Sequence, residues 1–181
     1  LKPLFMKNIL VIIVLFVSVF GFGQEKDKVS VFGRKHEIKI GAIHLLVAPI
    51  LEGTYEHIYS KDLTYGASLL INLNNKDYYD EEFSVTPFVR FYFQETKEYG
   101  AQGFFVEGFA KYLSGKYSPS IFNNTQIKPY SAGALGLGLG KKWFNSSGFV
   151  FETLVGIGRT IGGGDRPDVI FRGDIGLGYR F

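Results

Sequence analysis

Apolar and polar residues alternate along most of the chain after about residue 36. In the segment 63–73, Leu63, Tyr65 and Leu69 share one face, while Thr64 and Ser68 share the other. Segments 148–158 and 169–181 repeat this period of two, which is typical of a strand with two different faces. No helical periodicity of useful length interrupts the pattern. We predict strands over 37–46, 50–59, 63–73, 83–93, 103–113, 130–142, 148–158 and 169–181.

The lengths of these segments favour a membrane barrel over a soluble sandwich. Most span 10 to 13 residues, longer than the ~5–6 of an average strand and suited to tilted membrane spans of ~9–11. Short breaks at 60–62 and 144–147, and a longer one at 94–102, alternate with long breaks at 74–82, 114–129 and 159–168. Short periplasmic turns and longer outer loops are expected of outer-membrane barrels. The pattern predicts an all-β, antiparallel, up-and-down transmembrane β-barrel of about eight strands. Pro87 predicts a bulge or a later start in the fourth strand.

The first 23 residues have the features of an export signal. Lys7 precedes an apolar run from Ile9 to Phe20, and small residues at 21 and 23 precede a plausible cleavage site. Met6 is the expected true start. We therefore predict three regions: a signal peptide (1–23), a charged periplasmic lead-in (24–35) and a barrel (36–181).

Composition changes the picture through charge and cysteine. The whole chain has 20 basic and 17 acidic residues, but removing residues 1–23, with Lys2 and Lys7, leaves 18 and 17. This balance does not indicate a nucleic-acid partner. The absence of cysteine excludes disulfides, thiolate metal sites and cysteine nucleophiles.

The last strand is the most regular, with Val169, Phe171 and Ile175 on the face that continues to residue 181. It resembles the terminal strand of small outer-membrane barrels of the OmpA/OmpX type, in which an aromatic residue ends the chain and a Tyr stands two positions before it. The resemblance implies insertion in outer-membrane lipid and recognition by the barrel-assembly machinery. The residues that carry this resemblance are Leu177, Tyr179 and Phe181.

Aromatic residues also close the even-numbered strands. If the first strand runs outward, strands two, four, six and eight end on the periplasmic side. Aromatic rings prefer the membrane interface, so we predict a periplasmic aromatic girdle. Its members are Tyr59, Phe93, Trp143 and Phe181.

The alternation places a nearly balanced set of charges inside the barrel, among small or polar neighbours. Charges in a narrow interior must pair or hydrate because burying one alone is costly. We expect a salt-bridge network that fills the lumen; a proton or ion path would favour charges of one sign. The predicted set is Glu52, Glu56, Arg90, Glu107, Lys111, Glu152, Arg172, Asp174 and Arg180.

Catalytic and metal sites receive weaker support. A lipid A-modifying barrel would need a His, a Ser and an acid in hydrogen-bond reach; His44 with Ser68 or Ser84 is conceivable, while His36 and His57 lie nearer the periplasmic side. Hard-oxygen ligands for Ca²⁺ occur in the loop 74–82 without an EF-hand pattern. The glycine-rich stretch 136–142 lacks the residues of a phosphate loop. No catalytic, cofactor or metal site is predicted. The loop acids are Asp77, Asp80, Glu81 and Glu82.

These observations predict a non-enzymatic outer-membrane barrel with a structural or surface-interaction role through its extracellular loops, whose partner the sequence does not identify. Two alternatives remain: a lipid A-modifying barrel enzyme, and a soluble secreted barrel that binds a small apolar ligand.

Overall fold

The computed structural model describes residues 33–43, 49–73, 81–93, 100–117, 128–162 and 167–181. The chain divides into two units, Leu1–Ser30 and Val31–Phe181. The first unit, and with it the predicted signal peptide and most of the lead-in, lies outside the described residues.

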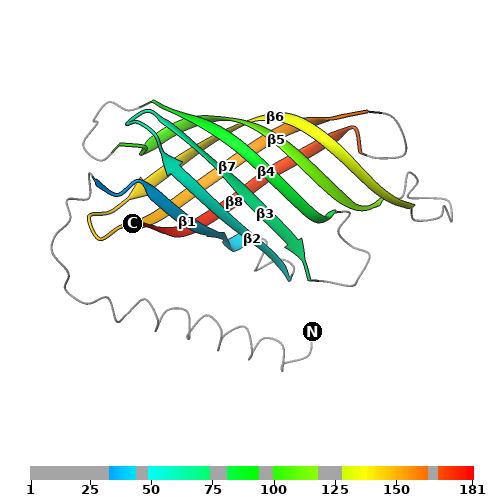
Figure 1. Cartoon of the computed structure of the whole chain (residues 1–181), viewed down its shortest axis with the longest axis horizontal. Helices are drawn as coiled ribbons and strands as arrows, with labels where there is room; N and C mark the ends of the chain where they lie inside the picture. The colour runs from blue at the N-terminus through cyan, green and yellow to red at the C-terminus, as the bar shows by residue number, and fades with distance from the viewer. Residues whose placement is uncertain (1–32, 44–48, 74–80, 94–99, 118–127, 163–166) are drawn as a thin grey trace, which may run out of the picture. The chain divides into compact units, whose positions relative to one another are not determined.

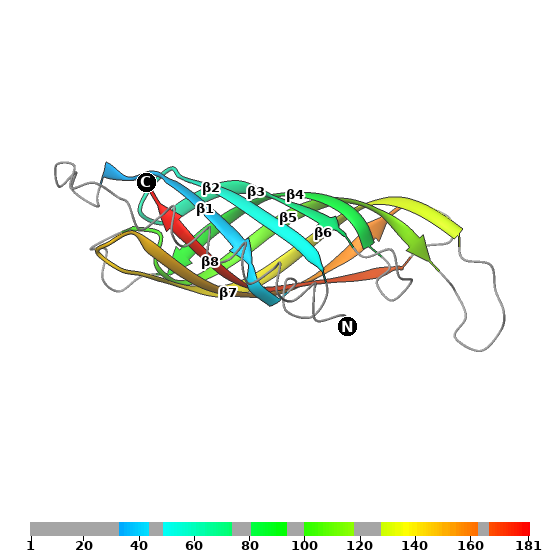
Figure 2. The same ribbon diagram turned by 90° about the horizontal axis from the view of Figure 1, so that it is seen from below.

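The second unit contains eight antiparallel strands that form a closed barrel (Figures 1 and 2). Each strand pairs with its neighbours in sequence, and the first pairs with the last, so the topology is up-and-down. No helix in the described part of the chain is long and apolar enough to cross a membrane. The strands are β1 (His36–Gly41), β2 (Ile50–Ile58), β3 (Leu63–Asn72), β4 (Glu81–Phe93), β5 (Gly103–Tyr117), β6 (Lys128–Phe144), β7 (Phe149–Ile161) and β8 (Val169–Arg180).

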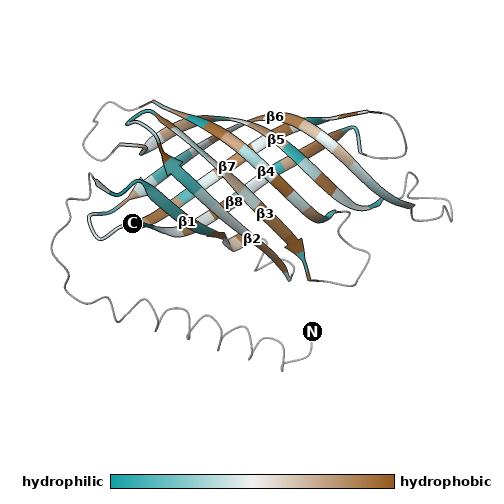
Figure 3. Ribbon diagram, viewed as in Figure 1, coloured by the Kyte–Doolittle hydropathy of each residue, from teal (hydrophilic) through white to brown (hydrophobic). Residues whose placement is uncertain are grey.

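Residue alternation explains how these segments close into a barrel. Buried and exposed residues alternate along the strands, and large hydrophobic side chains stand exposed on all eight of them, from Ile38 of β1 to Leu177 of β8. The same alternation appears as hydrophobic and hydrophilic steps along the strands in Figure 3. Because a one-residue slip would exchange the two faces, the pattern fixes the register of each pair.

The predicted all-β, antiparallel, up-and-down barrel is confirmed, with eight strands, and the largest difference in strand bounds concerns the first strand. We expected it to reach residue 46, but β1 ends at Gly41, and Ala42 and Ile43 are helical. The prediction was wrong here because the run from Ala42 to Val47 is almost continuously apolar, and such a run does not distinguish strand from helix. Strands β5 and β6 extend further than expected, to Tyr117 and from Lys128.

Pro87 does not produce the bulge or later strand start that we expected. It pairs with Ala67 of β3, and its exposed ring points outward. On the β5 side, the register from Val85–Tyr112 continues unchanged at Phe88–Phe109. Since proline lacks only its own N–H, the ladder loses hydrogen bonding locally without shifting. The register irregularity of β4 lies instead between Glu81 and Phe83.

The interior also contains large aromatic side chains, which the expectation of small or polar residues missed. Phe109 and Phe88 belong to one buried cluster, and Phe105 belongs to another with Tyr92. Phe109 lies directly across from Gly136, and a Cβ there would clash with its ring and approach the Ile157 carbonyl oxygen to 2.6 Å. Inward-facing glycines thus give these rings the space that a narrow barrel otherwise lacks.

Strands β2, β4, β6 and β8 all end at one end of the barrel, called here the C-terminal rim. The β6–β7 turn shows how compactly the rim connects strands: the Asn145 side-chain oxygen accepts hydrogen bonds from the backbone N–H groups of Ser147 and Phe149. Gly148 completes this turn with φ = +103°, a conformation that other residues rarely adopt.

Candidate functional site

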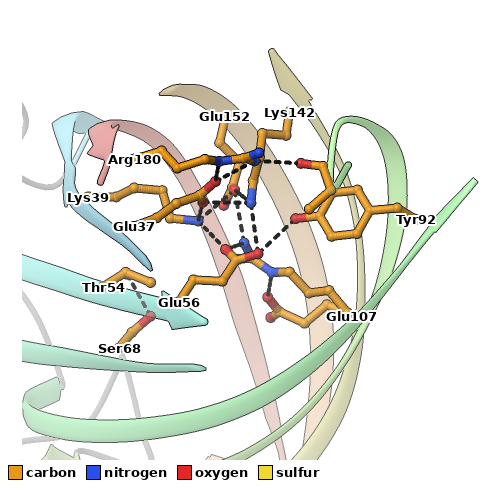
Figure 4. Close-up of polar contacts among 12 residues, drawn as sticks. Glu37, Lys39, Thr54, Glu56, Ser68, Tyr92, Glu107, Lys142, Glu152 and Arg180 are labelled. Carbon is orange, nitrogen blue, oxygen red and sulfur yellow. Dashed lines mark hydrogen bonds and ion pairs between the residues drawn. The ribbon is translucent and has the colours of Figure 1, made fainter. Parts of the chain in front are cut away.

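Charged side chains from seven of the eight strands converge in the barrel interior. The ion pairs connect them into one continuous set, called here the interior network. It has five carboxylates, Glu37, Glu52, Glu56, Glu107 and Glu152, and five cations, Lys39, Arg90, Lys142, Arg172 and Arg180. Each member is at most 8% exposed. In Figure 4, seven of these side chains point toward a common centre: Glu37, Lys39, Glu56, Glu107, Lys142, Glu152 and Arg180.

Glu56 of β2 lies at the centre of the interior network and is completely buried. Its Oε2 atom is 2.6 Å from Arg90 Nη1 and also contacts Lys39 Nζ, while its Oε1 atom is 2.7 Å from Lys142 Nζ. The Tyr92 hydroxyl donates a fourth hydrogen bond to Oε1 at 3.0 Å. Both oxygens of Glu56 therefore have two donors each, which compensates the loss of hydration on burial.

Glu152 of β7 contacts the same three cations from the other side. Its Oε2 atom is 2.7 Å from Lys39 Nζ, 2.8 Å from Arg90 Nη1 and 3.7 Å from Lys142 Nζ. Glu152 and Glu56 thus face each other across a layer of positive charge. This arrangement ties β1, β2, β4, β6 and β7 together across the lumen.

The network continues toward the end opposite the C-terminal rim through arginine side chains. Arg90 Nε donates to Glu107 Oε2 at 2.7 Å, and Arg172 Nε donates to Glu107 Oε1 at 2.9 Å. Arg172 also lies 3.5 Å from Glu52 and donates to the Ser68 hydroxyl at 3.0 Å. Arginine suits this position because its planar group donates in several directions at once.

Arg180 joins the network to the C-terminal rim. Its guanidinium donates to Glu37 Oε1 at 2.7 Å, and to the backbone carbonyl oxygens of Gly100 and Ala101 at 3.1 Å in both cases. Ala101 is fully buried, and its N–H donates to the Lys61 carbonyl at 2.7 Å. The described end of the β4–β5 connection therefore lies across this end of the lumen, held by the last residue of β8.

Aromatic rings surround the cations of the network. The Arg90 guanidinium lies 4.2 Å from the Phe88 ring centroid and 4.6 Å from that of Phe105. The Arg180 guanidinium lies 4.1 Å from the ring of Phe144. The faces of aromatic rings attract cations, so these residues fill space without adding a charge that would need a partner.

Of the nine interior charges predicted from sequence, seven lie in the interior network. Lys111 is also buried but pairs with Glu81, at 2.7 Å. Asp174 is half-buried on the inward side, and a Cβ on Gly41 would lie 2.7 Å from its Oδ2 atom. Sequence reasoning missed Glu37, Lys39 and Lys142. The alternation could have assigned them to the inward face. Glu37 and Lys39 alternate with Ile38 and Ile40, and Lys142 continues the face of Gly138 and Gly140.

The four predicted girdle residues are exposed on their strand ends or directly after them, at the C-terminal rim. Tyr59, Phe93, Trp143 and Phe181 have exposed fractions between 40% and 67%. Further outward rings accompany them: Phe91 contacts Phe93, Phe151 contacts Trp143, and Phe149 contacts Tyr179. Lys141 places its ammonium group between the rings of Phe104 and Trp143. Whether this band meets a membrane interface stays a prediction.

The residues considered for catalysis are separated. Ser68 is hydrogen-bonded to Thr54 and Arg172 inside the barrel, and Ser84 is buried on the same face. His36 and His57 point outward at the C-terminal rim, while His44 lies outside the described residues, as do Asp77 and Asp80. Glu81 and Glu82, the described acids of that loop, pair with Lys111 and Lys116. Among the described residues, no group of three or more His, Cys, Asp or Glu side chains is arranged to hold a metal ion.

Comparisons with known proteins show the fold. No protein-family profile and no curated protein sequence matches the chain. The chain is similar in structure to the N-terminal β-barrel domain of Pseudomonas aeruginosa OprF, with a TM-score of 0.52 and 13% sequence identity; the match covers 82% of this chain and 98% of that domain. At this identity the similarity supports an eight-stranded barrel architecture and carries no information about shared activity.

Proposed function

We propose that the chain is an integral outer-membrane β-barrel protein with a structural or surface-interaction role. Its barrel anchors the chain in lipid, and the segments at the end opposite the C-terminal rim face the outside of the cell and make the contacts. In this proposal the C-terminal rim faces the periplasm.

The inversion of polarity across the barrel wall is the observation that carries this proposal. Outward positions on every strand expose large apolar side chains, such as Val155 at 69% and Phe171 at 79%, whereas inward positions carry the interior network. A protein dissolved in water is stabilised when it buries such apolar area. An outward apolar band flanked by aromatic residues is the pattern of a barrel whose solvent is lipid.

The interior network supports a role other than open conduction. Rings of one charge sign would favour ion selectivity and passage, but the network balances five carboxylates with five cations. An eight-stranded barrel has an interior just wide enough to be filled by side chains. The proposed role therefore lies in the loops and the outer surface.

Neither alternative function receives comparable support. A soluble barrel that binds an apolar ligand needs an apolar lumen, whereas the middle of this one contains paired charges. A lipid A-modifying enzyme needs a base near its nucleophile, and the two described histidines point outward at the C-terminal rim, away from the interior that holds Ser68 and Ser84.

We further propose that the outward side chains at the end of β8 are read by the barrel-assembly machinery. Leu177 and Phe181 are about half exposed, at 53% and 50%. Replacing both with Ser should leave chains unassembled in the periplasm, visible as loss of the heat-modifiable folded band. Normal assembly of that variant would contradict this role.

Fractionation of a Gram-negative host that expresses the full chain tests the membrane location. We expect the chain in outer membranes after washing with alkaline carbonate, its release only by detergent, and faster gel migration without boiling. Recovery in the soluble periplasmic fraction or the medium would refute the proposal.

Protease treatment of intact cells tests the orientation. Cleavage should fall in the connections 73–80 and 118–127, at the end opposite the C-terminal rim. Cleavage at the β6–β7 turn around Asn145 would show the opposite orientation, with the C-terminal rim outside the cell.

Large single-channel conductance in planar bilayers would contradict the filled interior.

A further inference from the structure

Two histidine side chains face each other on the outer surface of the C-terminal rim. His36 of β1 is paired directly opposite His57 of β2, and both side chains are half-buried on the outward face. Their Nδ1 atoms are 3.5 Å apart, and their ring centroids are 4.9 Å apart. Neither residue belongs to the interior network.

The contacts around His36 Nδ1 exceed what one imidazole nitrogen can satisfy. A neutral ring nitrogen offers either one hydrogen or one lone pair. His36 Nδ1 lies 2.7 Å from the Tyr55 hydroxyl, which is a good hydrogen-bond distance. His57 Nδ1 lies 3.5 Å from His36 Nδ1, which is at the limit of a hydrogen bond. Two nitrogens therefore lie close together without a strong hydrogen bond between them.

Neighbouring rings hold the two imidazoles in this arrangement. His36 stacks against Tyr55 and Phe181, with ring centroids 6.0 and 5.9 Å away. His57 packs against Tyr65 at 5.2 Å. Because the rings are already positioned, a ligand that bridges them would cost little side-chain entropy.

We propose that His36 and His57 form a two-imidazole binding site for a divalent transition-metal ion. Metal–imidazole distances of about 2.0–2.1 Å and the 3.5 Å separation give a nitrogen–metal–nitrogen angle of roughly 115–120°, near the tetrahedral value. Imidazole suits Cu²⁺, Ni²⁺ and Zn²⁺, and Cu²⁺ binds most tightly in the general order of affinities.

Water completes the coordination in this proposal. The described residues supply no third His, Cys, Asp or Glu ligand at this place, so the site differs from a closed structural zinc site with four protein ligands. It is an exchangeable surface site at the C-terminal rim, and the Tyr55 hydroxyl turns away from His36 Nδ1 when the metal binds. The register of β1 against β2 brings the two histidines together wherever the barrel is located.

Calorimetric titration of Cu²⁺ and Zn²⁺ into the full chain tests the proposal. The protein is refolded in detergent micelles without a polyhistidine tag, at mildly alkaline pH, because metal ions bind the deprotonated form of their ligands. The variants are His36→Ala, His57→Ala and the matched control His44→Ala, which removes the remaining histidine of the sequence. Heat-modifiable migration confirms that each variant is folded.

We expect one equivalent of Cu²⁺ to bind more tightly than Zn²⁺, and His44→Ala to retain the affinity. His36→Ala and His57→Ala should each weaken binding by at least about tenfold, the lower end of what even outer-shell partners of a metal contribute. Electron paramagnetic resonance of the Cu²⁺ complex should show two coordinated nitrogens. Unchanged affinity in His57→Ala, loss of binding in His44→Ala, or no binding to the unsubstituted chain would overturn the proposal.

Discussion

Replacing Glu56 with Gln removes one negative charge from the centre of the interior network while keeping the size of the side chain. Glu56 is completely buried, and its carboxylate contacts Lys39, Arg90 and Lys142 within 2.7 Å. In Glu56→Gln the five cations of the network face four carboxylates. Each carboxylate oxygen of Glu56 accepts two hydrogen bonds, from cations or from Tyr92. In the variant, one of these oxygens is replaced by an amide NH₂ group, which donates hydrogen bonds instead of accepting them.

The expected loss in the free energy of unfolding is about 3–5 kcal/mol, the usual cost of removing one partner from a buried ion pair. The exposed pair Glu82–Lys116 provides the matched control, since its atoms are 3.0 Å apart and both side chains are about half exposed, at 52% and 50%. Glu82→Gln removes the same charge from an exposed pair and should cost at most about 1 kcal/mol.

Urea-induced unfolding in detergent micelles or lipid vesicles measures both variants. Fluorescence of Trp143, the single tryptophan of the chain, reports the transition. Adding Lys39→Met to Glu56→Gln restores charge balance and should recover at least about 1 kcal/mol, within the coupling expected for contacting residues. A Glu56→Gln loss no larger than that of Glu82→Gln, or a further loss in the double variant, would refute the charge-balance reasoning.

Three further predictions concern the glycines and the C-terminal rim. Gly136→Ala places a methyl group against the Phe109 ring and should lower the free energy of urea unfolding by about 1–3 kcal/mol. The control Gly133→Ala has nothing within 4 Å of the added Cβ and should change this free energy by no more than about 0.5 kcal/mol. Equal effects of the two variants would contradict the packing of Phe109 against Gly136. Gly148→Ala forces φ = +103° on a residue with a side chain and should cost at least about 1–2 kcal/mol, measured as a lower temperature for loss of the fast-migrating folded band; an unchanged temperature would contradict the strain. Arg180→Lys keeps the charge but cannot reach Glu37 and both rim carbonyls together, so urea unfolding should show a loss of about 1.5–3 kcal/mol; no loss would show that these hydrogen bonds contribute nothing.

The interior network favours the correct register of strand pairing, because its charged groups are shared between strands. Each of Glu56 and Glu152 contacts three cations from different strands. A one-residue register shift of any of the seven strands that carry the network would exchange the two faces of that strand and place a charge in the outward apolar surface. The network therefore penalises wrong pairings more strongly than apolar packing alone, which is tolerant of rearrangement.

The sequence by itself determined the barrel, its strand order and most of its interior charges. Alternation with a period of two is a local property, so β3, β7 and β8 could be located from their own residues. It also assigned Arg90, Glu107 and Arg172 to the inward face. The prediction failed at residues 42–43, where the apolar run lacks alternation, and at Pro87, where only the partner strands decide whether a missing N–H shifts the register.

Only the tertiary structure decided which charges and rings meet. Lys142 and Glu37 are 105 positions apart in sequence, yet their charged atoms lie 2.8 Å apart because closure of the barrel brings β6 to face β1. His36 and His57 became a pair through the register of β1 against β2. A residue's face follows from its neighbours in sequence, whereas its partner across the lumen depends on the strand count and stagger of the closed barrel.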